Sequence, residues 1–96
     1  MSKWYFVTNY SVTDPEGYAD YPKLVGATQA GLAARLLAGP GETIEGEPLD
    51  RTVVLEFESR EMFDEWYYSD AYQEILPLRR DNSKGWAILI EEHQPS

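Results

Sequence analysis

The segment from Arg51 to Arg80 constrains the fold of this chain more than any other part of it. It contains an apolar stretch and then two amphipathic stretches, RTVVLEFESREMFDEWYYSDAYQEILPLRR. Residues 52–58 are rich in β-branched and aromatic types, which is typical of a strand. Ser59 and Ser69 each precede apolar residues at helical spacing, so each is expected to cap the start of a helix. The segment therefore predicts a strand followed by two helices.

An arginine lies on the apolar stripe of the second of these helices. Positions i, i+3, i+4 and i+7 of the stripe are occupied by Tyr72, Ile75, Leu76 and Arg79. We therefore expect the Arg79 guanidinium to point inward, where it could bind a substrate carboxylate or stabilise a developing enolate. The alternative is a structural role, either in an ion pair with Glu56 or Asp14 or through burial of the aliphatic stem alone.

The N-terminal part of the chain predicts a strand and then a long helix. Residues 4–12 are rich in aromatic and β-branched types, and both faces of this strand begin apolar. Asp14 precedes a proline and an acidic residue, a pattern that indicates a helix start with Asp14 as its cap. The helix is expected to run to about Leu37, with either a kink at Pro22 or a short opening helix before it, because proline lacks a backbone donor.

The remaining segments predict two more strands. Residues 35–45 are expected to form a strand that is interrupted by Gly-Pro-Gly at residues 39–41, which suits a sheet edge or a bulge. Residues 81–85 are expected to form a loop, and residues 86–90 the last strand.

The predicted order of elements is βαββαβ, in a single domain of residues 1–96. This order predicts an α+β, ferredoxin-like fold with a four-stranded antiparallel sheet. Two helices can cover only one face of such a sheet, yet the strands predicted at residues 4–12, 52–58 and 86–90 carry apolar side chains on the other face as well. A second copy of the sheet is the simplest cover, so we expect a homodimer packed sheet to sheet, with the helices outside.

The charge of the chain limits its partners. Seventeen acidic residues against eight basic ones give a net charge of −9, which repels the phosphates of nucleic acids and anionic lipid headgroups. We therefore expect no nucleic-acid partner and no membrane partner. No apolar run resembles a signal peptide or is long enough to cross a bilayer, so a cytoplasmic location is expected. With no cysteine, one histidine and no phosphate-binding or dinucleotide motif, neither a metal nor a cofactor is expected.

Several pieces spread along the chain match the pattern of a known family. They are Tyr5 with the strand after it, Asp14 with Tyr18 and Tyr21, Glu45-Gly46, Val53 to Phe57 with Ser59, Trp66-Tyr67, Ser69 with Tyr72-Gln73, and Arg79. Over nearly its whole length the chain resembles the domain-of-unknown-function 1330 family, within the dimeric α/β-barrel superfamily. It departs from that family at residues 32–41, which lack the usual glycine pair and Arg-Gly-Gly turn, and at Asp70, where the family has proline.

The resemblance implies a pocket between the helices and the concave sheet of each subunit. Related folds include cofactor-free isomerases, monooxygenases and polyketide-processing enzymes. The favoured hypothesis is a small cofactor-independent enzyme of isomerase or cyclase type, which moves a proton on a small apolar acid or a polyketide-like metabolite. One alternative is a homodimer that binds such a ligand without catalysis, and another is a structural dimer without a ligand.

Four residues are candidates for catalysis. Arg79 would bind the anion, and either Glu56 or Tyr21 would move the proton. Glu56 lies in the middle of an apolar strand, where burial raises the pKa of an unpaired carboxylate; alternatively, it points to the dimer interface. His93 is a candidate proton shuttle if the last strand covers it, and otherwise a surface residue near the C-terminus.

Five residues are candidates for substrate binding. They are Asn9, Tyr18, Trp66, Tyr67 and Tyr72. The tyrosines combine a ring for apolar contact with a hydroxyl for a hydrogen bond, although tyrosines at helical spacing also occur as ordinary core residues. Asn9 is the polar break in the first strand, so it would either orient a ligand or form hydrogen bonds at an edge or interface.

Overall fold

A computed structural model describes residues 2–29, 35–38 and 41–93 of the chain. Its elements are β1 (Trp4–Val12), α1 (Pro15–Tyr18), α2 (Tyr21–Thr28), β2 (Arg35–Ala38), β3 (Arg51–Phe57), α3 (Arg60–Tyr67), α4 (Asp70–Arg80) and β4 (Ser83–Glu91). The predicted order of strands and helices is confirmed, with each of the two predicted helical regions formed by a pair of helices.

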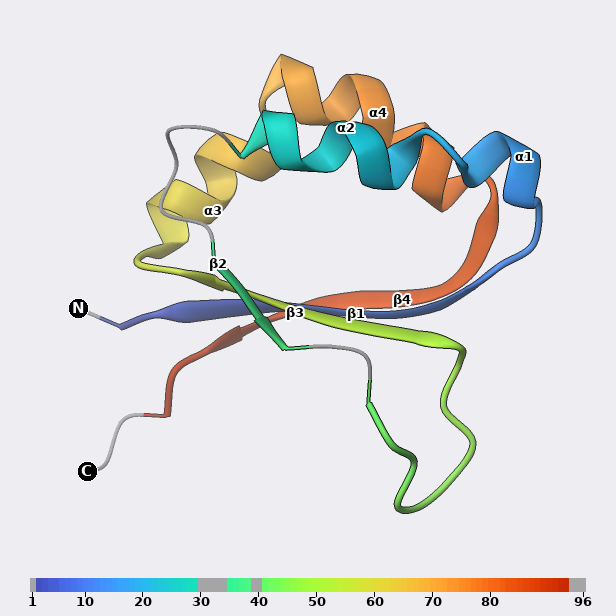
Figure 1. Cartoon of the computed structure of the whole chain (residues 1–96). Helices are drawn as coiled ribbons and strands as arrows, with labels where there is room; N and C mark the ends of the chain where they lie inside the picture. Colours follow the sequence, from blue (N-terminus) through green and yellow to red (C-terminus); the bar gives the residue numbers. More distant parts are fainter. Residues whose placement is uncertain (1, 30–34, 39–40, 94–96) are drawn as a thin grey trace.

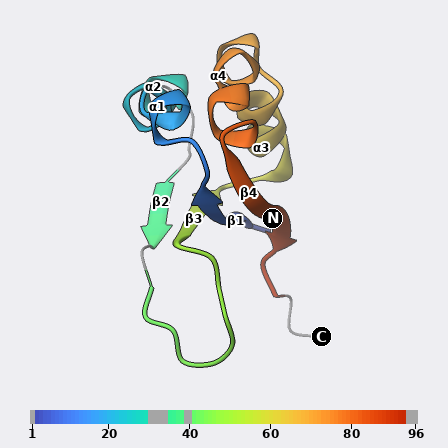
Figure 2. The ribbon, with the colours of Figure 1, turned by 90° about the vertical axis from the view of Figure 1, so that its right-hand side faces the viewer.

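The strands form one antiparallel sheet in the order β2-β3-β1-β4. Three long strands make up its body, and the short β2 is added at one edge. All the helices lie on the same side of the sheet (Figure 1). In the end view, α1 and α2 lie above the β2 edge, whereas α3 and α4 lie above the β4 side (Figure 2). The α+β class and the antiparallel sheet are therefore as predicted.

The register of β1 against β3 assigns side chains to the two faces of the sheet. Phe6 pairs with Leu55 and Tyr10 with Arg51, and these four residues face the helices. The core lies between this face and the helices and is mainly aromatic: Phe6, Tyr10, Tyr18, Tyr21, Phe57, Phe63, Trp66, Tyr72, Ile75 and Leu76. Both layers are therefore needed to bury these rings.

Serine caps begin α3 and α4, as predicted. The Ser59 hydroxyl accepts a hydrogen bond from the Met62 amide at 3.2 Å, and the Ser69 hydroxyl accepts one from the Tyr72 amide at 3.1 Å. Asp14 caps α1 in the same way, accepting from the amide of Gly17. Each cap satisfies a backbone donor that the helix itself leaves without a partner.

The helix predicted from Asp14 to about Leu37 is too long, but the short opening helix expected as one alternative at Pro22 is confirmed. The chain breaks between α1 and α2, just before Pro22. Pro22 lies in the first turn of α2, where the missing N–H costs nothing because that amide has no partner inside the helix. The helix also ends at Thr28, and Leu37 belongs to β2.

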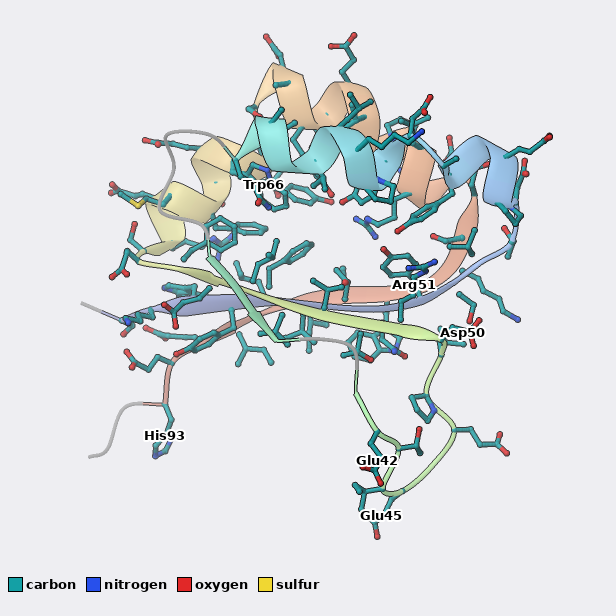
Figure 3. The ribbon with its side chains drawn as sticks, in the orientation of Figure 1. Glu42, Glu45, Asp50, Arg51, Trp66 and His93 are labelled. Atoms are coloured by element: carbon teal, nitrogen blue, oxygen red, sulfur yellow. The ribbon has the colours of Figure 1, made fainter. Side chains whose placement is uncertain are left out.

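The strand predicted at residues 35–45 is also too long. β2 covers Arg35–Ala38 only, residues 39 and 40 lie outside the described part, and residues 41–50 form an excursion without helix or strand. This excursion extends from the side of the sheet that faces away from the helices (Figure 1). It carries four acidic side chains, of which Glu42 and Glu45 are at its far end (Figure 3).

β4 begins at Ser83, earlier than the strand predicted at residues 86–90, and most of the predicted loop is therefore strand. Gly85 makes this possible because its φ of +153° is open to glycine and unfavourable for other residues. Gly85 pairs with Tyr10, and a Cβ at this position would clash with the Tyr10 backbone. Gly85 is therefore a point in β4 where the backbone of β1 leaves no room for a side chain.

The sheet face opposite the helices carries large apolar side chains. Trp86, Ile88 and Ile90 alternate along β4 and are between 45% and 49% exposed. They lie beside Tyr5 and Val7, which β1 contributes to the same face. None of the helices in the described ranges is long and apolar enough to span a bilayer.

Candidate functional site

A cavity of about 520 Å³ lies between the helix layer and the sheet. Its walls are mostly aromatic and aliphatic and include Phe6, Tyr10, Tyr18, Tyr21, Val25, Leu55 and Trp66. Two arginines, Arg51 and Arg79, are the charged side chains among the described residues that line it. The cavity occupies the position that the family resemblance implies.

Arg79 points inward, as its position on the α4 stripe predicted. It is only 9% exposed, and its guanidinium lies 5.8 Å from the ring centroid of Tyr10 and 5.9 Å from that of Tyr21. No carboxylate of the described residues lies within salt-bridge distance, and the Arg79 Nε has no hydrogen-bond partner among them. The predicted alternative, an ion pair with Glu56 or Asp14, is therefore absent.

The charge of Arg79 is retained despite burial. Burial alone lowers the pKa of this guanidinium. The neighbouring hydroxyls of Tyr72 and Tyr21 together raise it by more than burial lowers it, so the pKa of Arg79 is raised overall. The aromatic faces of Tyr10 and Tyr21 also stabilise the cation. The cavity thus presents a permanent positive charge in an apolar setting.

Two hydrogen-bonded pairs of tyrosines surround this charge. The Tyr10 and Tyr18 hydroxyl oxygens are 2.7 Å apart, and those of Tyr21 and Tyr72 are 2.8 Å apart. Burial raises the pKa of Tyr10 and Tyr21 well above the ordinary value, and the paired hydroxyls raise it further. These phenols therefore stay protonated at neutral pH. One hydrogen serves each pair, so each pair has a second hydroxyl hydrogen that this bond does not use.

Tyr21 accordingly keeps its proton in this environment, and a role as general base is disfavoured. A base must give up its own proton near the working pH, and the raised pKa of Tyr21 opposes that. Tyr18 is buried and lines the cavity.

The other predicted aromatic residues are divided between the cavity wall and the core. Trp66 lines the cavity, and its indole donates to the Thr28 hydroxyl at 2.9 Å (Figure 3). Tyr72 lies behind this wall, with its ring 4.2 Å from that of Trp66 and its hydroxyl on Tyr21. Tyr67 stacks on Phe63 in the core and does not line the cavity.

Glu56 does not lie near Arg79 in the structure. Alternation along β3 places it on the face opposite the helices, where it pairs with Tyr5 in register. Its carboxylate lies 3.5 Å from the ammonium of Lys3. The hypothesis that Glu56 moves a proton beside Arg79 therefore fails on geometry, because the sheet lies between them. The alternative position on the uncovered face agrees with the structure.

Asn9 lies on that same face and has a structural role. Its side-chain amide donates to the Thr52 hydroxyl at 2.9 Å and to the Arg51 carbonyl at 3.0 Å, and its side-chain oxygen accepts from the Leu49 amide at 3.0 Å. It thus ties the end of the acidic excursion to β1, and it does not line the cavity.

His93 also lies outside the cavity. It follows β4, is exposed, and is on the side of the sheet away from the helices (Figure 3). The last strand ends at Glu91 and does not cover it. A proton-shuttle role for His93 in this cavity is therefore contradicted by its position.

Arg51 is a cavity residue that the sequence analysis missed. It is the first residue of β3 and faces the helices, with its guanidinium 5.4 Å from the ring centroid of Tyr18 (Figure 3). The predicted strand began one residue later, which left Arg51 outside it. The two-residue alternation that places Val53 and Leu55 on the inner face would have found Arg51 if extended by one step.

No cluster of three or more His, Asp or Glu side chains able to hold a metal ion occurs in the ranges that the structure describes.

Comparison with known proteins identifies related chains. Residues 3–93 match the family described as "Domain of unknown function (DUF1330)". A crystal structure of methylated RPA0582 protein is similar over 98% of this chain and 83% of that one, with a TM-score of 0.74 and 18% identity. SnoaB, described as a cofactor-independent oxygenase from Streptomyces nogalater, is similar over 99% of this chain and 97% of its own, with a TM-score of 0.67 and 14% identity. No curated protein matches. At these identities the solved structures support the fold alone.

Proposed function

We propose a ligand-binding function for this chain, which belongs to the family of domain-of-unknown-function 1330 proteins. The cavity binds a small, largely apolar acid whose carboxylate pairs with Arg79. The observation that carries this proposal is the buried Arg79 guanidinium, which lines the cavity without a counter-ion among the described residues. A buried charge without a partner is costly, and a carboxylate forming two parallel hydrogen bonds would supply that partner.

The size and lining of the cavity support an apolar body for this acid. A volume of about 520 Å³ lies in the range of small-molecule pockets, roughly 300–1,000 Å³. Trp66, Phe6 and Leu55 offer apolar surface, and the tyrosine pairs each offer one hydroxyl hydrogen to an oxygen of the ligand. Such a wall with a few polar groups orients a ligand by its acid end.

A second candidate is a cofactor-independent enzyme of the isomerase, cyclase or monooxygenase type. It is favoured by one observation: Arg79 and the protonated phenols of Tyr10 and Tyr21 converge on one space, where they would stabilise an enolate as it forms. SnoaB, which shares the fold, is itself described as a cofactor-independent oxygenase. However, no carboxylate or imidazole lines the cavity among the described residues, so binding is better supported than proton transfer.

We also propose that the protein is a homodimer joined through its sheet faces. The support is the apolar patch of Trp86, Ile88 and Ile90, which lies on the one face of the sheet that no helix covers. A second copy would bring an identical patch, so that each covers the other around a twofold axis. The helices and the cavity would remain on the outside of such a dimer.

Calorimetric titration with two isosteric probes tests the binding proposal. 3-Phenylpropanoate carries a carboxylate, whereas 3-phenylpropanamide has nearly the same shape without a charge. Wild-type protein should bind the acid at least tenfold more tightly than the amide, and Arg79→Gln should remove that preference. Arg60→Gln is the matched control, because Arg60 also lies over an aromatic ring but pairs with Asp64 away from the cavity. Equal binding of acid and amide by the wild type would refute the proposal.

A further inference from the structure

The arginines of the cavity differ from most other basic residues of the chain. Four described basic side chains lie within salt-bridge distance of an acid: Lys3, Lys23, Arg60 and Arg80. Arg51 and Arg79 have no such partner among the described residues, although the chain holds seventeen acids. Two unpaired cations that line one cavity in an acidic protein indicate that anionic partners come from outside the chain.

A tyrosine pair connects the two arginines. The Arg51 guanidinium lies over the ring of Tyr18, and the Arg79 guanidinium lies over the ring of Tyr10. These two rings are 6.0 Å apart, and their hydroxyls share a hydrogen bond of 2.7 Å. Tyr10 thus lies between two positive charges, both of which favour its ionised form and so oppose the effect of burial. The cavity therefore has a charge at each end of this pair.

The two charges have different surroundings. Arg79 is buried, whereas Arg51, at the first residue of β3, lines the same cavity and is exposed. The distant acids of the chain are screened at physiological salt, because the Debye length is then about 8 Å. The charged side chains that line the cavity itself, among the described residues, are the two arginines, despite the net charge of −9.

The position of Arg51 is itself fixed by buried contacts. The Asn9 side chain, 4% exposed, donates to the Arg51 carbonyl and to the Thr52 hydroxyl. Arg51 also pairs with Tyr10 across the two strands. Asn9 is thus a positioning residue, which holds the start of β3 so that the Arg51 side chain stays at the cavity.

We infer that the natural ligand is an apolar dicarboxylic acid, with one carboxylate bound by Arg79 inside the cavity and the other bound by the exposed Arg51. This inference rests on the proposed function and specifies its ligand class. The aromatic wall between the two arginines contacts the apolar middle of the molecule. The second carboxylate also offsets the repulsion between two cations that share one cavity.

The test uses four probes, one monocarboxylate and three isomeric dicarboxylates. 3-Phenylpropanoate is compared with its three analogues that carry a second carboxylate at the ortho, meta or para position of the ring. These analogues vary the spacing between the two acids in fixed steps. Wild-type protein should bind at least one of them about two- to fivefold more tightly than 3-phenylpropanoate, by calorimetry at low ionic strength, as expected for one partly exposed ion pair. This gain should shrink as salt is added.

Variants then separate the two arginines. Arg51→Gln should abolish the gain from the second carboxylate and weaken binding of 3-phenylpropanoate far less than Arg79→Gln does, while Arg51→Lys should keep part of the gain. Arg79→Gln should weaken all four probes. Arg60→Gln, whose arginine lies 5.4 Å from the Trp4 ring as Arg51 does from the Tyr18 ring, should change none of them.

The possible failures are distinguishable. If 3-phenylpropanoate binds through Arg79 but no analogue gains affinity, or if the gain survives in Arg51→Gln, the dicarboxylate inference is overturned and the proposed function stands. If none of the four probes binds to the wild type, both are overturned.

Discussion

The guanidinium of Arg79 lies 5.8 Å from the ring centroid of Tyr10, across the cavity from helix α4 to strand β1. This contact joins the two layers of the fold where, among the described residues, a basic side chain is buried without an acid. Tyr10 in turn pairs with Arg51 in the sheet and bonds to Tyr18 in α1. A single tyrosine thus links both arginines and three elements.

The first prediction concerns whether Arg79 serves the fold or the ligand. Replacing Arg79 by Met keeps most of the apolar volume and removes a buried charge. Exchanging buried charges for apolar residues is often neutral or stabilising, so the free energy of unfolding of Arg79→Met should fall by no more than about 1 kcal/mol. Urea unfolding measures this quantity. A loss of more than about 3 kcal/mol would mean that Arg79 completes a structural ion pair.

The inward position of Arg79 could be predicted because it depends on local spacing alone. The same holds for the caps at Ser59 and Ser69, where a side chain bonds to an amide three residues ahead. The side of the sheet on which Glu56 lies could not be predicted from local spacing, because it depends on which residues of the strand meet the helices. Arg51 was missed for a related reason, since the start of β3 is held by Asn9, which is 42 residues away in the chain.

The misplaced boundaries have non-local causes as well. The helix predicted to reach Leu37 ends at Thr28, and the early start of β4 depends on Gly85 passing close to Tyr10. Neither the pairing of β2 with β3 nor the contact at Gly85 is visible in a window of neighbouring residues. Local sequence patterns thus predicted the capped helix starts and which segments form strands. Tertiary contacts determine several of the boundaries of these elements.

The second prediction tests the close approach at Gly85. Gly85→Ala introduces a Cβ that meets the Asn9 carbonyl and the Tyr10 backbone, at a φ that alanine disfavours. The variant should lose more than about 1 kcal/mol of stability. Gly26→Ala is the matched control: it has no atom near the added Cβ and lies in α2, so it should gain up to about 1 kcal/mol. Thermal or urea unfolding of both variants gives the comparison, and a neutral Gly85→Ala would contradict the geometry.

The third prediction is a pH dependence that arises from the buried phenols. The pKa of Tyr21 is raised above its ordinary value of 10.0 in the folded state, chiefly by burial. The unfolded state therefore loses its proton first, so this contribution to stability is complete below about pH 10 and is lost as the pH rises above it. Urea unfolding between about pH 8 and pH 11 should show this decline, with a slope from one such group of at most about 1.4 kcal/mol per pH unit.

The variant Tyr21→Phe tests whether Tyr21 causes this loss of stability at high pH. Tyr21→Phe should be less stable than the wild type at pH 8, since it leaves the Tyr72 hydroxyl without its partner, a cost of about 1–3 kcal/mol. Its stability should nevertheless fall less steeply above pH 10. Tyr68→Phe, which changes an exposed tyrosine, should keep the wild-type slope. Identical slopes in Tyr21→Phe and the wild type would show that Tyr21 does not contribute.

The fourth prediction tests the sheet-to-sheet dimer. Ile88 is 46% exposed on the uncovered face of the sheet, whereas Leu24 is 43% exposed on α2 in the helix layer. Ile88→Asp would place a charge in the proposed interface, where it would meet apolar side chains of the second copy and lose its hydration. Leu24→Asp adds the same charge at a similar exposure on the opposite side of the molecule. In analytical ultracentrifugation the wild type and Leu24→Asp should sediment as dimers at micromolar concentration, and Ile88→Asp as a monomer. A monomeric wild type, or an Ile88→Asp variant as dimeric as Leu24→Asp, would exclude this face as the interface and leave the ligand proposals for the opposite face untouched.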